Sequence, residues 1–240
     1  MKAFGFLSFG HYGHGRGPGD PDARRALHDA VEIAVGADEI GVNGAYWRVH
    51  HFARQAASPV PLLAAAGART GRIEVGTGVI DMRYENPLHL AEEIASLDLL
   101  TDRRIAIGIS RGSPEQARRG WEAFGYAAGS DERGTDLAHA HTAQLLDAVR
   151  GVPQADLDTS NGMAPGASAR LRIEPHSPGV DRRLWWGGGI ARDGRVDGPS
   201  GTEPHELHPA DRGHRRGSGR APGRADPPHG VGRATTGPRA

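Results

Sequence analysis

The sequence predicts an α/β fold built on a parallel sheet, and its length favours a (β/α)8 barrel over a doubly wound sheet. Segments with strand and helix patterns alternate from the start of the chain. The strand segments are continuous apolar runs, as expected for strands that are covered on both faces. Polar and glycine-rich residues follow these runs, at the edge where parallel sheets bind ligands. About six strands precede the point where the pattern stops, so the predicted barrel is incomplete.

The strands are predicted from short apolar runs that end at glycine or at polar residues. The first run stops at Gly10, and the second ends in the pair His50-His51. The third contains Gly76-Thr-Gly78, and the fourth ends in Ser110-Arg111-Gly112. The predicted strands are 2–9, 44–51, 73–80, 105–112, 171–174 and 183–188.

The helices are predicted where apolar residues recur every three or four positions after a proline suited to the first helical turn. Pro21 begins the first helix, and Ala26, Ala30 and Ala34 lie on one face of it. Pro87 begins a helix with a broader apolar face. The predicted helices are 21–36, 61–68, 87–100 and 136–149, with a linker at 121–126.

Composition excludes several functional classes. The 240 residues contain no cysteine, which excludes a disulfide scaffold, a thiolate metal site and a cysteine nucleophile. The 29 basic residues balance 29 acidic ones, so no overall positive charge favours nucleic acid. No apolar run approaches the ~20 residues of a membrane helix, and the N-terminus does not match a signal peptide. We therefore expect a cytoplasmic protein with no membrane partner, and we expect no metal site.

The C-terminal part of the chain differs in composition from the rest. Between residues 191 and 240 the only large aliphatic side chains are Val196, Leu207 and Val231, and there is no aromatic residue. Such a segment cannot bury enough apolar surface to offset the entropy of ordering it. We therefore expect a foldable part over residues 1–189 and a low-complexity, disordered part over residues 190–240.

His50 and His51 close the second predicted strand. Neighbouring residues on a strand point to opposite faces, so the pair cannot chelate one metal ion. We expect one imidazole at the barrel mouth, where it suits acid–base catalysis, and the other to pack outward. The alternative is that both histidines are structural.

Gly108-Ile-Ser-Arg-Gly112 matches the G-x-S-x-G pattern of hydrolase nucleophiles. A serine hydrolase that uses Ser110 is therefore one hypothesis. A second makes Arg111 an anion clamp, because the guanidinium fork matches phosphate. In the third, Ser110 is a helix cap and Arg111 is a surface residue.

Gly76 and Gly78 leave the backbone bare where the third predicted strand meets the expected ligand edge. Glycine at such a position permits the close approach of a flat ligand. The alternatives are a β-bulge or a tight contact with a neighbouring element.

Taken together, these segments resemble the bacterial-luciferase-like flavin-dependent monooxygenases over nearly all of residues 1–189. The resemblance implies a (β/α)8 barrel that binds reduced FMN at its C-terminal face, or the deazaflavin F420 in sister groups. It also implies a partner flavin reductase, molecular oxygen and a small organic substrate, and it is compatible with a homodimer. The matching segments are Ala37–Gly41, Arg48–Phe52, Val75–Gly78, Glu85–Pro87, Ala91–Glu93 and Ile109–Gly112.

The resemblance also implies roles for individual residues. His50 would be the active-site imidazole. Thr77, Gly78 and Val79 would lie against the flavin ring, with the family's non-prolyl cis peptide between Gly78 and Val79.

Two further residues would reach the flavin. Ser110 and Arg111 follow the fourth strand, and Arg111 would point to the flavin phosphate. One departure from the family pattern is Arg103, which replaces the usual glycine of the turn before that strand, so we expect strain there.

The family's phosphate loop, G-S-R-x-T, is missing after Gly189. If the reading frame moves by one base there, the bases that encode residues 189–226 can instead encode G-S-R-A-T, an amphipathic helix and an apolar strand. Our hypothesis is that the chain from about Ile190 onward is read out of frame. We then expect impaired flavin binding in the chain. The alternative is a genuine basic arm that touches nucleic acid through Arg212, Arg215, Arg216 and Arg220.

Overall fold

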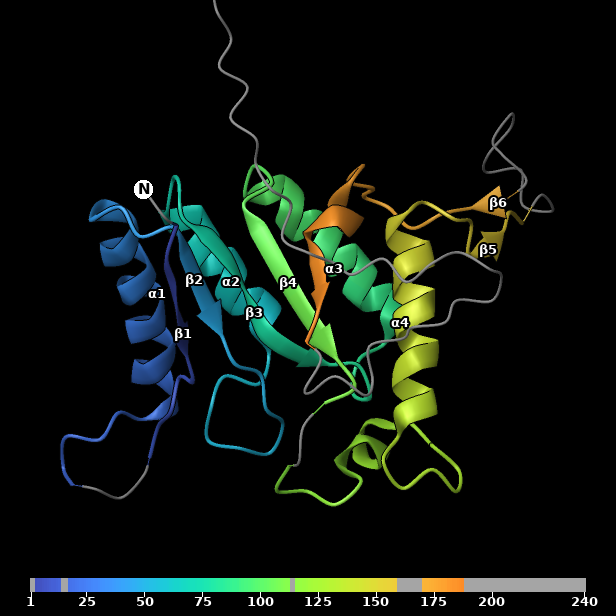
Figure 1. Cartoon of the computed structure of the whole chain (residues 1–240), viewed down its shortest axis with the longest axis horizontal. Coiled ribbons are helices and arrows are strands. Elements are labelled where there is room, and N and C mark those ends of the chain that lie inside the picture. Colours follow the sequence, from blue (N-terminus) through green and yellow to red (C-terminus); the bar gives the residue numbers. More distant parts are fainter. Residues whose placement is uncertain (1–2, 14–16, 113–114, 159–169, 188–240) are drawn as a thin grey trace, which may run out of the picture. The chain divides into compact units, whose positions relative to one another are not determined.

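The computed structural model describes residues 3–13, 17–112, 115–158 and 170–187. The predicted tail over residues 190–240 lies outside these ranges. A five-stranded, all-parallel sheet with the strand order β1-β2-β3-β4-β7 organises the described residues (Figure 1). Its strands are β1 (Gly5–Ser8), β2 (Gly44–Trp47), β3 (Glu74–Asp81), β4 (Ile105–Ser110) and β7 (Leu184–Trp186).

Each of the first four strands leads into a helix, as the alternating pattern predicts. Neighbouring helices contact one another in chain order and cover one side of the sheet (Figure 1). Asp22 and Asn86 cap the first and third helices through their side-chain oxygens, and Pro59 and Pro87 occupy first turns. The helices are α1 (Ala23–Glu39), α2 (Pro59–Arg69), α3 (Pro87–Leu100) and α4 (Thr135–Val149), with short 3-10 turns η1 (Gly120–Phe124) and η2 (Val180–Arg183).

The prediction of a barrel strand over residues 171–174 is wrong. Arg170–Leu171 forms β6, which pairs antiparallel with β5 (Ala155–Asp156) in a separate two-stranded sheet. All four residues are exposed, so this hairpin has no buried face that could join the main sheet. The parallel sheet of the described residues therefore has five strands, where we expected about six.

Two predicted strands also end earlier than expected. β2 stops at Trp47, so His50 and His51 lie in the following loop, and β4 stops at Ser110. The residues by which both predictions run too far, 48–51 and 111–112, are mostly polar or charged and belong to the loops at the ligand edge.

The core lies between the helices and one face of the sheet. Strand residues Trp47, Val75, Ile107 and Leu184 are almost fully buried there, together with the apolar faces of α2, α3 and α4. The opposite face is the inner face of the predicted barrel. Glycines and a few apolar side chains occupy it, with Leu7 about half exposed. No helix among the described residues has the length and apolar character needed to cross a membrane.

Asp38, in the segment Ala37–Gly41, has a structural role at the end of α1. Its carboxylate accepts backbone N–H bonds from Gly71 (2.8 Å), Arg72 (3.2 Å) and Ile73 (2.8 Å). Burial raises the pKa of this carboxyl, but the three backbone hydrogen bonds outweigh it and the pKa is lowered overall. Asp38 thus holds the end of α1 to the segment that enters β3.

The turn before β4 is strained where the sequence departs from the family pattern. Asp102 and Arg103 both have left-handed backbone conformations, with φ of 51° and 64°. A left-handed conformation costs a non-glycine residue roughly 1–2 kcal/mol. The strain expected at Arg103 is confirmed.

Replacing Arg103 by glycine should therefore stabilise the chain by about 1 kcal/mol, because glycine adopts this conformation without steric cost. Thermal unfolding followed by circular dichroism measures the effect. Arg182→Gly is the control, since Arg182 is exposed and has an ordinary φ, and it should destabilise. A melting temperature that falls in Arg103→Gly would contradict the assigned strain.

Candidate functional site

The candidate site lies at the C-terminal edge of the sheet, where β3 carries a bulge. Thr77 pairs with Ile107 and Ile80 with Ile109, so Gly78 and Val79 together oppose the single residue Gly108. The peptide bond between Gly78 and Val79 is cis, as the family resemblance implied.

Apolar groups from both ends of the sheet surround this bulge. A Cβ atom on Gly78 would lie 2.9 Å from Leu7 Cδ1 of β1, and one on Gly187 would lie 2.9 Å from Val79 Cγ1. On the same inner face, the Trp185 indole packs over Gly108. The bulge therefore lies on an apolar, partly exposed surface that a flat ring system could cover.

His50 lies in the loop after β2 and is partly buried. Arg48 Nε donates a hydrogen bond to His50 Nε2 at 3.1 Å, so this nitrogen acts as an acceptor. Burial lowers the pKa of His50, the Arg48 charge lowers it further, and Asp81 opposes both. The imidazole is therefore neutral at neutral pH, with the lone pair of Nε2 engaged by Arg48 and the proton on Nδ1.

His51 is buried among aromatic side chains, and the acid–base role of His50 stays a prediction. The His51 ring stacks on Tyr84, with the centroids 4.2 Å apart, and its Nε2 lies 3.9 Å from Glu85 Oε1. Burial lowers the pKa of His51 and raises that of Glu85 to about 7, where the Glu93 and Asp81 charges act in the same direction. His51 therefore favours its neutral form at pH 7, and Glu85 is about half protonated there.

The hydroxyls of Thr77 and Ser110 form hydrogen bonds with backbone groups. Thr77 is fully buried and donates to the Gly108 carbonyl at 2.9 Å. The Ser110 hydroxyl accepts from Gly112 N–H at 2.9 Å. Within the described ranges no hydrogen bond joins a histidine to Ser110, and no described helix follows it directly as in a nucleophile elbow. The geometry does not support a serine hydrolase.

Arg111 lies between two anchored residues. The Ser110 carbonyl before it accepts from Met82 N–H at 2.9 Å. Gly112 after it, with φ of 87°, packs so closely that an added Cβ would lie 2.0 Å from Asp81 Oδ2. The backbone on either side of Arg111 is thus fixed, at Ser110 by Met82 and at Gly112 by Asp81.

Our sequence reasoning missed a buried polar cluster beside this segment, made of Asp81, Arg83, Tyr84 and Glu115. Arg83 Nε donates to Asp81 Oδ1 at 2.9 Å, and its guanidinium stacks on Trp121 at 4.5 Å. The Tyr84 hydroxyl donates to Glu115 Oε2. The sequence indicated only the charged residues at the end of β3 and just after it. Glu115 is distant from them in sequence, and no motif spacing links it to them.

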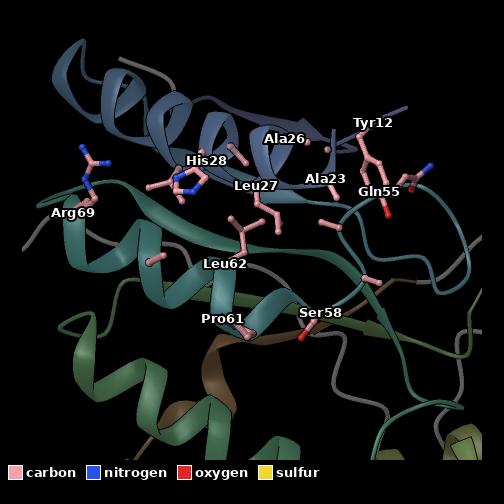
Figure 2. A pocket seen from close by; sticks show the side chains of 16 residues that line it. Tyr12, Ala23, Ala26, Leu27, His28, Gln55, Ser58, Pro61, Leu62 and Arg69 are labelled. Atoms are coloured by element: carbon pink, nitrogen blue, oxygen red, sulfur yellow. The ribbon is translucent and has the colours of Figure 1, made fainter. Parts of the chain in front are cut away.

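A separate cavity of about 580 Å3 lies between α1 and α2, in the helix layer (Figure 2). Leu27 and His28 of α1 face Leu62 of α2 across it. Its walls are mainly alanine, leucine and proline, and Arg69 at one end pairs with Glu32. Because this cavity lies on the helix side of the sheet and the bulge faces the opposite side, the cavity is distinct from the candidate site. No group of three potential metal ligands occurs within the described ranges.

Comparison with known proteins identifies the family. The family model described as luciferase-like monooxygenase matches residues 1–190. The chain belongs to this family of oxidoreductases. Limonene 1,2-monooxygenase of Rhodococcus erythropolis is 32% identical over 111 residues, which are 45% of this chain and 29% of that protein.

Two other relatives of this luciferase-like chain differ in cofactor. The oxygenase component of a flavin-dependent trigonelline monooxygenase from Acinetobacter baylyi is 28% identical over 110 residues, 45% of this chain and 31% of that protein. An F420-dependent glucose-6-phosphate dehydrogenase of Amycolatopsis mediterranei is 30% identical over 92 residues, 35% of this chain and 27% of that protein. A flavin-type cofactor is therefore supported for the family as a whole.

Among solved structures, the oxygenating constituent of 3,6-diketocamphane monooxygenase from Pseudomonas putida, determined with FMN, shares the fold of this luciferase-like chain. Its TM-score is 0.56 at 18% identity, over 77% of this chain and 50% of that one. The chain thus spans about half the length of the solved relative, and the described residues form part of a luciferase-like barrel. The predicted fold class is confirmed.

Proposed function

We propose that this protein is a flavin-dependent monooxygenase that uses reduced FMN and molecular oxygen to oxidise a small organic substrate. The observation that carries the proposal is the bulge of β3 at Gly78–Val79, which lies on an apolar surface at the C-terminal edge of the sheet, the edge from which the loop with His50 also leaves. Membership in the luciferase-like family supports it.

The residues at the edge of the sheet fit a flavin. The bulge and the surrounding Leu7 and Trp185 offer an apolar surface to the ring system, and Arg111 offers a guanidinium fork to the phosphate. When bound, reduced FMN supplies the electrons for oxygen activation. His50 is neutral, and its Nε2 gives up the hydrogen bond from Arg48 when it accepts a proton or a donor group of the substrate. The apolar inner face excludes water from the reaction.

An F420-dependent oxidoreductase on the same barrel is the second candidate, because relatives of both cofactor types match this chain. Turnover assays with reduced FMN and with reduced F420, each with an oxygen electrode, distinguish the two. We expect oxygen consumption with reduced FMN from a partner reductase. Turnover with F420 alone, without oxygen uptake, would favour the second candidate.

We also propose that the chain from about Ile190 onward is read out of frame, and that its flavin affinity is therefore low. The family match ends at residue 190, which supports this proposal. Sequencing the coding DNA across Trp186–Asp193 tests it. An error of one base in the read, with the in-frame gene encoding G-S-R-A-T, would confirm the proposal, and an unaltered frame would contradict it.

His50→Ala in the frame-restored protein should lower oxygen-coupled turnover by about 10²–10⁴-fold, the usual contribution of a positioned acid or base. The melting temperature should stay within about 2 °C, because His50 is only partly buried. His28→Ala is the control, since His28 is exposed on α1. Unchanged turnover in His50→Ala would reject the assigned role.

A further inference from the structure

Glu115 is a buried acid that the proposed reaction does not use. Its side chain is only 5% exposed, although it lies in the irregular segment between β4 and η1. The Tyr84 hydroxyl donates to its Oε2, and Arg83 Nη2 lies 3.7 Å from its Oε1. A buried carboxyl with so many defined partners indicates a specific structural or functional role.

The partners of Glu115 belong to the loop after β3. Asp81, 3% exposed, ends the strand, and Arg83 binds it through Nε at 2.9 and 3.1 Å. Arg83 also donates to the Arg133 carbonyl at 3.1 Å, just before α4. The cluster therefore joins the end of β3 and the loop after it to Glu115, Trp121 and Arg133, which lie between β4 and α4.

The same cluster contacts the residue next to Arg111. An added Cβ on Gly112 would lie 2.0 Å from Asp81 Oδ2 and 2.3 Å from Arg83 Nη2. The backbone of Gly112 is thus in direct contact with the side chains of Asp81 and Arg83. The position of Arg111 follows from the position of the cluster.

We propose that Glu115, in its protonated form, is a positioning residue for Arg111, because it completes the cluster with Asp81, Arg83 and Tyr84 that holds the segment after β4. The role of Arg111 as the phosphate ligand rests on the proposed function. Glu115 itself does not touch the flavin.

The charges around Glu115 explain why its protonated form is the one that holds the cluster. Asp81, Arg83 and Tyr84 face it from β3 and the loop that follows, and Arg119 lies beyond Trp121, 5.8 Å from the ring centroid. Burial raises the pKa of Glu115 to about 7, and its hydrogen bond with Asp81 acts in the same direction, whereas the hydrogen bond from Tyr84 and the charge of Arg83 oppose both. Below this pH the carboxyl donates to the Asp81 carboxylate. Above it, two carboxylates share one arginine and repel each other.

Hydrogen exchange tests the proposal in the chain without any flavin. In the wild type, protection of the amides of residues 115–124, corrected for the intrinsic rate, should fall about tenfold between about pH 6 and about pH 8. Glu115→Gln stays neutral and keeps a donor, so the fall in its protection should be much smaller than in the wild type, with only the share that Glu85 contributes near pH 7 remaining. Glu132→Gln, an exposed acid in the same segment, should behave as the wild type. An undiminished pH dependence in Glu115→Gln would overturn the proposal.

Titrations with oxidised FMN and with riboflavin, which lacks the phosphate, test the link to Arg111. At about pH 6, Glu115→Ala should lower the ratio of FMN affinity to riboflavin affinity about tenfold, as loss of one charge-assisted contact does. Riboflavin affinity itself should not change. A Glu115→Ala ratio equal to that of the wild type would overturn the positioning role. If the wild type instead shows no preference for FMN, the assignment of Arg111 to the phosphate fails, whatever hydrogen exchange shows.

Discussion

Gly76→Ala is expected to abolish stable folding. The Cβ atom would lie 2.1 Å from the Ala106 carbonyl oxygen and 2.9 Å from Tyr46 Cδ1, whereas real Cβ contacts are not shorter than 3.0 Å. Gly76 and Ala106 are paired in the β3–β4 ladder, so neither backbone can move without breaking the sheet. The expected loss exceeds about 4 kcal/mol, a large part of the stability of an ordinary domain.

Soluble yield and urea unfolding followed by tryptophan fluorescence measure this effect. Gly36→Ala is the matched control, because Gly36 lies within α1 and an added Cβ meets nothing within 4 Å. It should stabilise the chain by about 0.5–1 kcal/mol through helix propensity. Gly78→Ala should fold, since its added Cβ meets only the flexible end of the half-exposed Leu7. A Gly76→Ala variant as stable as Gly78→Ala would contradict the packing described for β3 and β4.

Asp98→Ala is expected to destabilise the chain by about 3 kcal/mol, the usual cost of breaking a buried ion pair from one side. Asp98 is fully buried on α3. Its Oδ2 accepts from the Ser177 hydroxyl at 2.6 Å, and its Oδ1 lies 3.3 Å from Arg183 Nε. These contacts fix the segment that leads into β7, so the edge strand of the sheet should be lost first.

Two variants calibrate the Asp98 result in the same unfolding experiment. Ser177→Ala removes one hydrogen bond and should cost about 1 kcal/mol. Glu92→Ala, an exposed acid on the same helix, should change the stability by less than about 0.5 kcal/mol. A loss below about 1 kcal/mol in Asp98→Ala would show that the ion pair does not anchor β7.

The sequence predicted the regular part of the fold well, for physical reasons that particular residues show. Apolar runs ending at glycine or at polar residues located all five strands of the parallel sheet, and Pro87 after the capping Asn86 marked the start of α3. The hairpin of β5 and β6 misled the prediction. Leu171 is a strand residue, but its 41% exposure and its place outside the parallel sheet depend on tertiary packing that local patterns do not encode.

The candidate site was predictable only in part. The family pattern located the cis peptide at Gly78–Val79 and marked Arg103 as strained, and the structure confirms both. It did not predict that the Thr77 hydroxyl donates to the Gly108 carbonyl of the neighbouring strand. Glu115 was missed because its partners are 31 or more residues away in sequence, so only the fold brings them together.

The central claim is that the described residues form one part of a flavin site that the in-frame protein completes. Calorimetric titration of FMN into the chain and into its frame-restored version tests this claim most directly. We expect weak binding to the chain and tight, one-to-one binding to the restored protein. Tight, stoichiometric binding to the chain as it stands would contradict the account, and so would a restored protein that binds no flavin.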